Sequence, residues 1–369
     1  MSCSSDPRVV LTLDAGGTKF AFSAVQGDRE VVEAVTLPSN AHDLTLCLDT
    51  IVLGFTKVKE QAPAPPVAIS FAFPGPADYP TGIIGDLGNL PAFKGGGIAL
   101  GPMLEDRFGV PVFMNNDGDL FALGEAIAGL LPWANGLLAA GGSPKRFRNL
   151  FGATFGTGFG GGIVQDGRLW RGDNSAGGEI WLFRNKLDPR TNIEEAVSIR
   201  AIRRVYAEKA GIAFPTAPEP RDIFEIGKGT RPGSREGALE AFRRMGEAAG
   251  DALASAITLV DGLVVIGGGL TGAADLFLPA LVAEMNAPFE TPSGPLPRLE
   301  MKVFNLEDEA QRGEFVRGAT TEVPVPGSSR RVSYDPLERT GVGLSRLGTS
   351  RAVAIGAYAF ALGELDRND

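Results

Sequence analysis

The sequence predicts an α/β protein built from two related halves, and three observations support this prediction. The 369 residues exceed what one ordinary hydrophobic core requires, which indicates two domains or lobes. Apolar segments of strand length alternate with segments of helical periodicity. A strand, a glycine-rich turn and a second strand ending in Val-Gln occur twice, within residues 9–33 and 150–171. We interpret this pair as a duplication that heads each half; chance similarity of two glycine-rich hairpins is the alternative.

The first half is predicted to begin with strands and to alternate with helices afterwards. Strands are expected at VVLTLD, FAFSAVQ and EVVEAVTL, which are apolar or alternate in polarity. Apolar residues then recur at intervals of three and four between residues 42 and 60, which predicts a helix. The later elements are a strand over 67–73, a helix over 102–109, a strand over 110–117 and a helix over 119–131.

The second half begins with the second glycine turn, flanked by the strands LFGATF and FGGGIVQ. Helical periodicity follows over 193–211, 221–228 and 236–260, and the apolar run GLVVIGGG then leads into a helix over 275–287. A last helix is expected at SRAVAIGAYAFALGEL. The segments 131–147 and 287–349 resemble additions to the fold, and we consider two roles for them: covering a cleft or forming a subunit contact.

Composition excludes several classes of function. The net charge of −9, from 44 acidic and 35 basic residues, argues against a large nucleic-acid-binding surface. We find no run of about 20 apolar residues, so no membrane span is expected, and the N-terminus lacks the pattern of a signal peptide. Cys3 and Cys47 make neither a disulfide framework nor a metal site. We therefore expect a cytoplasmic protein.

Three glycine-rich turns stand at the ends of apolar strands: DAGGTK at 14–19, GTGFGGG at 156–162 and GGGLTG at 267–272. Each alone is more often a structural turn. Together they indicate a nucleotide-binding cleft, because glycines allow phosphate oxygens to approach the backbone closely. Asp14 adds a carboxylate of the kind that Mg2+ prefers, and Lys19 adds a positive charge.

The stretch MNNDGDL at 114–120 joins a buried strand to a helix. Asn116 and Asp117 are suitable helix N-caps, which is the structural interpretation. A functional Asp117 would be held at a rigid strand end, ionised by the helix N-terminus, and able to accept a hydroxyl proton. Phosphoryl transfer to an alcohol requires such a base together with a metal ion on the phosphates.

The order of motifs resembles the ROK family of sugar kinases, part of the actin/hexokinase/Hsp70-like superfamily. The resemblance covers about residues 8–286 and the last ~20, and it rests on DAGGTK, the PGP loop, NND before a helix with GEA, GTGFGGG, AGGE, the E-x-x-S of EEAVS, and VVIGGG. It implies a two-lobed actin-like ATPase fold with a ribonuclease-H-like core in each lobe and an interlobe cleft. The N-terminal lobe would comprise 1–117 and the C-terminal helix 350–369, and the C-terminal lobe would comprise 118–349.

The resemblance also implies roles for single residues in ATP-dependent phosphorylation of a hexose or amino-sugar hydroxyl. Asp117 would be the general base, and Asp14 would bind Mg2+ directly or through water. The implied nucleotide-binding residues are Gly16, Gly17, Thr18, Lys19, Gly156, Thr157, Gly158, Gly267, Gly268 and Gly269. The implied sugar-binding residues are Asn116, Glu179, Glu195, Gly75 and Asn89. Glu194 is the alternative to Glu195, whose spacing to Ser198 fits E-x-x-S. A homodimer is also implied.

Two departures from the family pattern change the expected chemistry. Leu182 stands where the family has a histidine that contacts the sugar and the zinc region. The next stretch, RNKLDPRTNI, contains neither Cys nor His, and the chain's single histidine is His42, which we interpret as a surface or capping residue. We therefore expect no zinc and an altered sugar specificity. Trp181 is a candidate for stacking on a sugar, with core packing as the alternative.

Two other functions are compatible with the same fold. A sugar-responsive transcriptional repressor would carry an N-terminal helix-turn-helix module, but only 13 residues precede Asp14, and the charge is acidic. A catalytically silent sugar or nucleotide sensor is the second alternative. The absence of the family histidine and of the family's cysteine cluster favours it. The retained Asp14, Asp117 and glycine turns favour the kinase.

Overall fold

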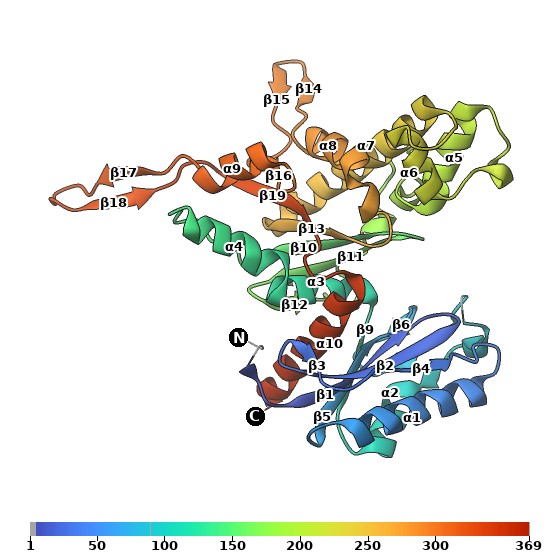
Figure 1. Ribbon diagram of the computed structural model, residues 1–369. Coiled ribbons are helices and arrows are strands. Elements are labelled where there is room, and N and C mark those ends of the chain that lie inside the picture. The colour runs from blue at the N-terminus through green and yellow to red at the C-terminus, as the bar shows by residue number, and fades with distance from the viewer. Residues whose placement is uncertain (1–4, 89, 369) are drawn as a thin grey trace. The chain divides into compact units, whose positions relative to one another are not determined.

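The structure is a computed structural model that describes residues 5–88 and 90–368. It contains two compact units (Figure 1). Unit 1 combines the chain up to Gly129 with Gly162–Gly177 and the segment from Leu347 onward. Unit 2 comprises Leu130–Gly161 and Gly178–Arg346.

The first six-stranded sheet has the order β3-β2-β1-β5-β9, with β4 also paired to β2. β1 and β2 are antiparallel, whereas β1, β5 and β9 are parallel. The predicted strand over 30–37 is divided, because residues 31–34 form no strand pairs with β2 between the end of β3 and the start of β4. The bounds are β1 Val9–Ala15, β2 Lys19–Gln26, β3 Arg29–Glu30, β4 Val35–Pro38, β5 Pro66–Ala72 and β9 Val112–Asn115. Three short strands form a separate small sheet: β6 Ala77–Asp78, β7 Ile83–Ile84 and β8 Ile98–Ala99.

Helices cover both faces of the first sheet (Figure 1). Alternate residues of a strand face opposite sides of a sheet, so Val9 and Leu11 pack in one core cluster and Val10 packs in another. The first cluster includes residues of α1 (Leu44–Gln61) and α2 (Leu100–Phe108). The second includes Tyr358 and Leu362 of α10 (Thr349–Asn368).

Helix α10 also packs closely against α3 (Asp117–Ala128). A Cβ atom at Gly124 of α3 would overlap the backbone of Ala352, and one at Gly356 of α10 would overlap the backbone of Leu120. Glycine at both crossing points therefore allows the two helix backbones to touch.

The second six-stranded sheet has the order β12-β11-β10-β13-β19-β16. As in the first sheet, an antiparallel hairpin borders parallel strands, so β12-β11-β10-β13-β19 corresponds to β3-β2-β1-β5-β9. This shared topology agrees with the interpretation of a duplication. The bounds are β10 Leu150–Phe155, β11 Phe159–Gln165, β12 Arg168–Trp170, β13 Leu263–Gly267, β16 Lys302–Asn305 and β19 Arg339–Leu344.

Two predicted helices are each divided in the structure. The helix predicted over 119–131 ends at Ala128, and a second one starts at Leu130 after Gly129. The helix predicted over 193–211 consists of the 3-10 turn Ile193–Glu195 and a separate α5. The remaining helices are α4 Leu130–Ala140, α5 Ile199–Ala210, α6 Pro220–Lys228, α7 Arg235–Val260, α8 Ala274–Met285 and α9 Glu309–Arg317.

The segment Asp117–Ala140, which comprises α3 and α4, is long and apolar enough to cross a membrane, although no such segment was expected from the sequence. Within the structure, 61% of its apolar window is buried. Helices in a protein core have the same composition, so this segment is weak support for a membrane span.

The Pro- and Gly-rich segment 287–349 contributes more to the fold than its weak strand signals suggest. β16 and β19 are two of the six strands of the second sheet. The rest forms α9 and two separate hairpins (Figure 1), which are β14 Phe289–Thr291 with β15 Gly294–Leu296, and β17 Thr321–Pro324 with β18 Arg331–Tyr334.

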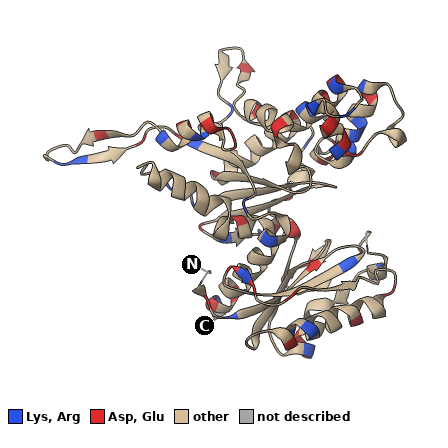
Figure 2. Ribbon diagram, viewed as in Figure 1, with Lys and Arg blue, Asp and Glu red and all other residues tan. Residues whose placement is uncertain are grey.

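Acidic and basic side chains are mixed over α5 and α6 (Figure 2).

Candidate functional site

In unit 1, the candidate residues gather where parallel strands end. Asp14 lies near the end of β1, Gly75 follows β5, and Asn116 and Asp117 follow β9. Ligands bind at this edge of a parallel sheet in many α/β proteins. These four residues line one cavity of about 460 Å3. The predicted Asn89 lies outside the described residues.

The start of α10 completes this cavity with residues that sequence reasoning missed. Thr349 and Ser350 line it beside Asp14 and Asp117. No motif marks them, because they meet β1 and α3 only through the crossing of the two helices. They bring two hydroxyl groups to a cavity whose other polar side chains are two carboxylates and one amide.

The sequence left two roles open at this position, a helix N-cap and a general base, and Asn116 and Asp117 differ in which of them their geometry suits. Asn116 is the N-cap of α3, and its Oδ1 accepts a hydrogen bond from the N–H of Asp119 at 2.6 Å. Asp117 is the first helical residue, and its carboxylate is exposed in the cavity. The capping bond occupies the oxygen of Asn116, so its amide N–H groups are what this side chain offers to a ligand.

The carboxyl of Asp117 has a perturbed pKa. Although Asp117 can be reached from the cavity, the protein around the cavity partly desolvates its carboxylate and raises this pKa above its usual value. The N–H of Gly118 donates to Asp117 Oδ1 at 2.9 Å and opposes the shift, whereas the negative charge of Asp14 adds to it. A raised pKa brings a carboxylate closer to the strength that suits a general base at neutral pH.

One of these two carboxylates, that of Asp14, is of the kind that can hold a magnesium ion. Mg2+ is commonly held by one or two carboxylates, with phosphate oxygens and waters as its other ligands. In the part of the chain that the structure describes, no group of three or more His, Cys, Asp or Glu side chains is placed to hold a metal. A magnesium ion held by Asp14 would take its remaining ligands from phosphates and water.

The first glycine turn, between β1 and β2, is held in shape by its backbone. The N–H of Gly16 donates to the carbonyl of Lys19 at 3.1 Å, and a Cβ at Gly16 would lie 2.9 Å from that oxygen. Ser39 Oγ donates to the carbonyl of Gly17 at 2.8 Å. The side chains of Thr18 and Lys19 are exposed and available to a ligand.

In unit 2, the second and third glycine turns follow the adjacent parallel strands β10 and β13. Gly268 has a φ of +91° and packs against the backbone of Phe155, so a Cβ there would overlap it. The N–H of Ile199 at the start of α5 donates to the carbonyl of Gly156 at 2.9 Å. The two turns and the first turn of α5 therefore form one edge of the unit.

A cavity of about 450 Å3 in unit 2 lies beside the third turn. Gly269 and Gly272 form one wall, and Phe224 and Glu225 of α6 form another. A Cβ at either glycine would meet open space, so close packing does not require glycine at these two positions. The aromatic wall and bare backbone of the cavity fit a flat ring such as adenine. A helix was expected over 221–228, but its place beside the third turn was not predicted, because only the tertiary fold brings α6 there.

The candidate sugar-binding glutamates of unit 2 differ in their contacts. Glu179 accepts a hydrogen bond from Trp181 Nε1, and Trp181 is half-buried. Leu182, at the position of the family histidine, is 59% exposed. His42 is exposed beside Asp43, the N-cap of α1, in agreement with a surface role.

Glu194 and Glu195 share Arg200 as a partner and differ in their second one; Arg200 lies 2.9 Å from Glu194 Oε1. Both oxygens of Glu195 are occupied by arginines, with Arg200 at 2.7 Å and Arg204 at 2.7 Å, and their hydrogen bonds lower its pKa. Glu194 Oε2 accepts from the N–H of Phe159, within the second glycine turn, at 3.1 Å. The structure therefore brings Glu194, rather than Glu195, to that turn.

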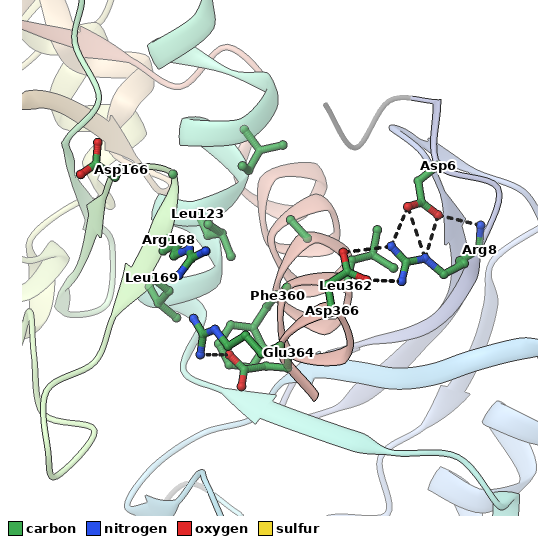
Figure 3. Close-up of a pocket in the computed structure, with 15 residues that line it drawn as sticks. Asp6, Arg8, Leu123, Asp166, Arg168, Leu169, Phe360, Leu362, Glu364 and Asp366 are labelled. Atoms are coloured by element: carbon green, nitrogen blue, oxygen red, sulfur yellow. Dashed lines mark hydrogen bonds and ion pairs between the residues drawn. The ribbon is translucent and has the colours of Figure 1, made fainter. Parts of the chain in front are cut away.

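A third cavity, of about 320 Å3, contains none of the predicted residues (Figure 3). It lies in unit 1 beside the C-terminal part of α10. On one side Arg8 forms ion pairs with Asp6 at 2.7 Å and with Asp366 at 2.6 Å, and Arg168 lies across α10 (Figure 3). Positive and negative groups are mixed, so the cavity does not indicate one class of ligand.

Comparisons with known proteins agree on one family. Residues 10–294 match the model of the ROK family. A solved glucokinase from Parabacteroides distasonis aligns with a TM-score of 0.90 and 55% identity, over 98% of this chain and 99% of that chain. The N-acetyl-D-glucosamine kinase of Vibrio vulnificus is 33% identical over 175 residues, so the match spans 47% of this chain and about half, 52%, of that protein. The enzyme of the same name from Photobacterium profundum is 30% identical over 73% of this chain and 88% of its own length.

Proposed function

Because the chain belongs to the ROK family, we propose that it transfers the terminal phosphoryl group of ATP to a hydroxyl group of a hexose or an amino sugar. The observation that carries this proposal is the position of Asp117 at the N-terminus of α3, in one cavity with Asp14. The names of the relatives, glucokinase and N-acetyl-D-glucosamine kinase, support a sugar as the acceptor.

Asp117 would act as the general base. Its carboxylate is open to the cavity, and its raised pKa makes it a stronger proton acceptor than an ordinary aspartate. In the proposed step, Asp117 takes the proton of the sugar hydroxyl while that oxygen attacks the terminal phosphorus of ATP, and ADP leaves. The amide of Asn116 would donate to a neighbouring sugar oxygen.

Two positively charged groups would balance the charge of the phosphates: Mg2+, which Asp14 of unit 1 would hold, and the ammonium of Lys19. A bound Mg2+ would neutralise phosphate charge during transfer. Asp14 would hold it directly or through water, and the exposed side chains of Thr18 and Lys19 would contact phosphate oxygens. The bare backbone of Gly16 and Gly17 would allow close approach.

The nucleotide would be bound in unit 2. The cavity beside Gly269 would take the adenine ring, and the turn of Gly156, Thr157 and Gly158 would take phosphates. Gly267 and Gly268 would act indirectly, because Gly268 fits against Phe155 and thereby sets the course of the third turn.

Glu179 and one residue of the pair Glu194 and Glu195 would accept hydrogen bonds from sugar hydroxyls, with Gly75 as a further sugar contact. Glu194 is favoured as the ligand by its contact with the second glycine turn, which Glu195 lacks. Replacement of the family histidine by the exposed Leu182 supports a hydroxyl preference that differs from other members. We further propose that the enzyme is cytoplasmic and that it forms a homodimer. Light scattering would test the homodimer.

A product assay tests the proposed function. The protein is incubated with ATP, Mg2+ and each of a panel of hexoses and amino sugars, and sugar phosphates are identified by mass spectrometry and 31P NMR. We expect one sugar to be phosphorylated much faster than the rest. Binding of both a sugar and ATP, seen by calorimetry, without any sugar phosphate would contradict the kinase and support a silent sensor instead.

A further inference from the structure

A hairpin of unit 2, residues 183–193, joins the two turns that carry candidate sugar-binding glutamates. Glu179 precedes the 3-10 helix Ile180–Leu182, and Glu194 lies in the 3-10 helix Ile193–Glu195. The family resemblance implies zinc in this stretch. The residues present do not fit zinc: the stretch has neither Cys nor His, and its one carboxylate, Asp188, is paired with Arg190 at 2.9 Å.

The base of the hairpin ties the two turns to each other. The N–H of Ile193 donates to the carbonyl of Phe183 at 2.7 Å, and Arg184 and Asn192 form an antiparallel bridge. Ile193 is fully buried, so the base is anchored in the core. Any movement of the hairpin base would therefore move both glutamate-bearing turns.

The middle of the hairpin is closed by a buried asparagine. Asn185 is 4% exposed, and its backbone N–H donates to the carbonyl of Thr191 at 3.0 Å. Its side-chain amide donates to Thr191 Oγ1 at 3.1 Å, and its Oδ1 accepts from the N–H of Leu187 at 2.9 Å. Hydrogen bonds thus cross-link the two arms of the hairpin.

Lys186 fastens the hairpin to two helices of the core. Its Nζ lies 2.7 Å from Glu284 Oε1 of α8 and 3.6 Å from Glu247 Oε1 of α7. Burial lowers the pKa of Lys186, but the hydrogen bond with Glu284 and the charge of Glu247 raise it more, so the ammonium stays charged. An ammonium that bridges two partly buried carboxylates contributes more stability than one isolated ion pair on the surface.

We infer that hairpin 183–193 is a metal-free clamp, in which Lys186 is a positioning residue for the sugar-binding turns of Glu179 and Glu194. This inference rests on the proposed sugar kinase function. Lys186 contacts neither glutamate and acts by holding the hairpin between α7 and α8. The clamp fixes the distance between the two turns, and therefore the affinity for the sugar rather than the chemistry of transfer.

The test compares Lys186→Met with Lys186→Arg and with Lys302→Met. Lys302 of β16 is the matched control, because it also forms a lysine–glutamate ion pair, with Glu314 at 3.2 Å, away from the hairpin. We expect Lys186→Met to raise the KM for the sugar by roughly 5- to 10-fold and to change kcat and the KM for ATP less than about 2-fold. Lys186→Arg should restore the sugar KM, since a guanidinium can bridge both carboxylates.

Two further measurements separate this inference from the proposed function. Hydrogen–deuterium exchange over residues 179–195 should accelerate in Lys186→Met but not in Lys302→Met, whether or not sugar is phosphorylated. Treatment of the purified protein with 1,10-phenanthroline should leave the melting temperature and the sugar KM unchanged. An unchanged sugar KM and exchange pattern in Lys186→Met, or loss of stability with the chelator, would overturn the clamp. Wild-type protein that never forms a sugar phosphate would overturn the proposed function alone.

Discussion

Gly124 of α3 contacts the backbone of Ala352 in α10 so closely that no side chain fits between them. The first residues of both helices line the same cavity: Asp117 begins α3, and Thr349 begins α10. The reciprocal contact, between Gly356 and Leu120, lies at the same crossing. The relative position of the candidate base and the hydroxyl groups of α10 therefore depends on two glycines that contact no ligand.

Substitution Gly124→Ala should destabilise unit 1, because the new methyl group would overlap a backbone oxygen that cannot rotate away. We expect a loss of about 1–3 kcal/mol in the free energy of unfolding, measured by urea denaturation. The matched control is Gly363→Ala in α10, where a Cβ would meet open space. The control should be neutral or up to about 1 kcal/mol more stable, because alanine favours helix. Equal stability of both variants would contradict the close crossing.

The rate of phosphoryl transfer should depend on pH through Asp117. The base must be ionised to accept a proton, so kcat/KM for the sugar should fall as the pH drops through the raised pKa of Asp117. The fall in kcat/KM should therefore occur at a higher pH than the usual pKa of an aspartate. A pH–rate profile at saturating ATP measures it. A rate that stays constant down to the ordinary aspartate pKa of about 3.9 would contradict the assignment.

The same pKa shift predicts an effect on stability. A carboxyl whose folded-state pKa is raised stabilises the fold below its unfolded pKa of about 3.9, and this contribution is lost as the pH rises through the folded pKa. At pH 7 the ionised Asp117 is therefore unfavourable for folding. We expect Asp117→Asn to raise the melting temperature at pH 7 and to lose this advantage in acid. A lower melting temperature for the variant at pH 7 would show that the carboxylate stabilises the fold.

The choice between Glu194 and Glu195 can be tested with a matched pair of variants. Glu194→Gln should raise the sugar KM by about 10-fold or more, because Glu194 lies at the second glycine turn. Glu195→Gln should instead weaken the ion pairs with Arg200 and Arg204, at a cost of about 0–1 kcal/mol in stability, and leave the sugar KM close to wild type. Steady-state kinetics and thermal unfolding of both variants decide the question, and the opposite pattern would identify Glu195 as the ligand.

Local sequence patterns predicted much of the fold. The α/β class that these patterns predicted is confirmed, as is the actin-like ATPase fold that the family resemblance implied. Strand ends could be predicted because a buried strand followed by a glycine turn leaves few alternatives, as at Asp14 and Gly267. The start of α3 could be predicted because Asn116 is a good N-cap and an apolar run follows.

Features that depend on tertiary contacts could not be predicted. The helix predicted over 193–211 is interrupted because Glu194 binds the N–H of Phe159 and Ile199 binds the carbonyl of Gly156. Periodicity does not record such contacts, although it correctly indicates the apolar face of α5. Phe224 on α6 and Ser350 on α10 reach their cavities in the same way, through the packing of distant segments.

The central claim is that Asp117 is the base of a sugar kinase, and the kcat of Asp117→Asn with the preferred sugar tests it most directly. Asparagine keeps the size of the side chain but cannot accept the hydroxyl proton. The account predicts that kcat falls by roughly 10²- to 10⁴-fold, while the dissociation constants for sugar and ATP, measured by calorimetry, stay within about 3-fold of wild type. A kcat within about 3-fold of wild type would contradict it.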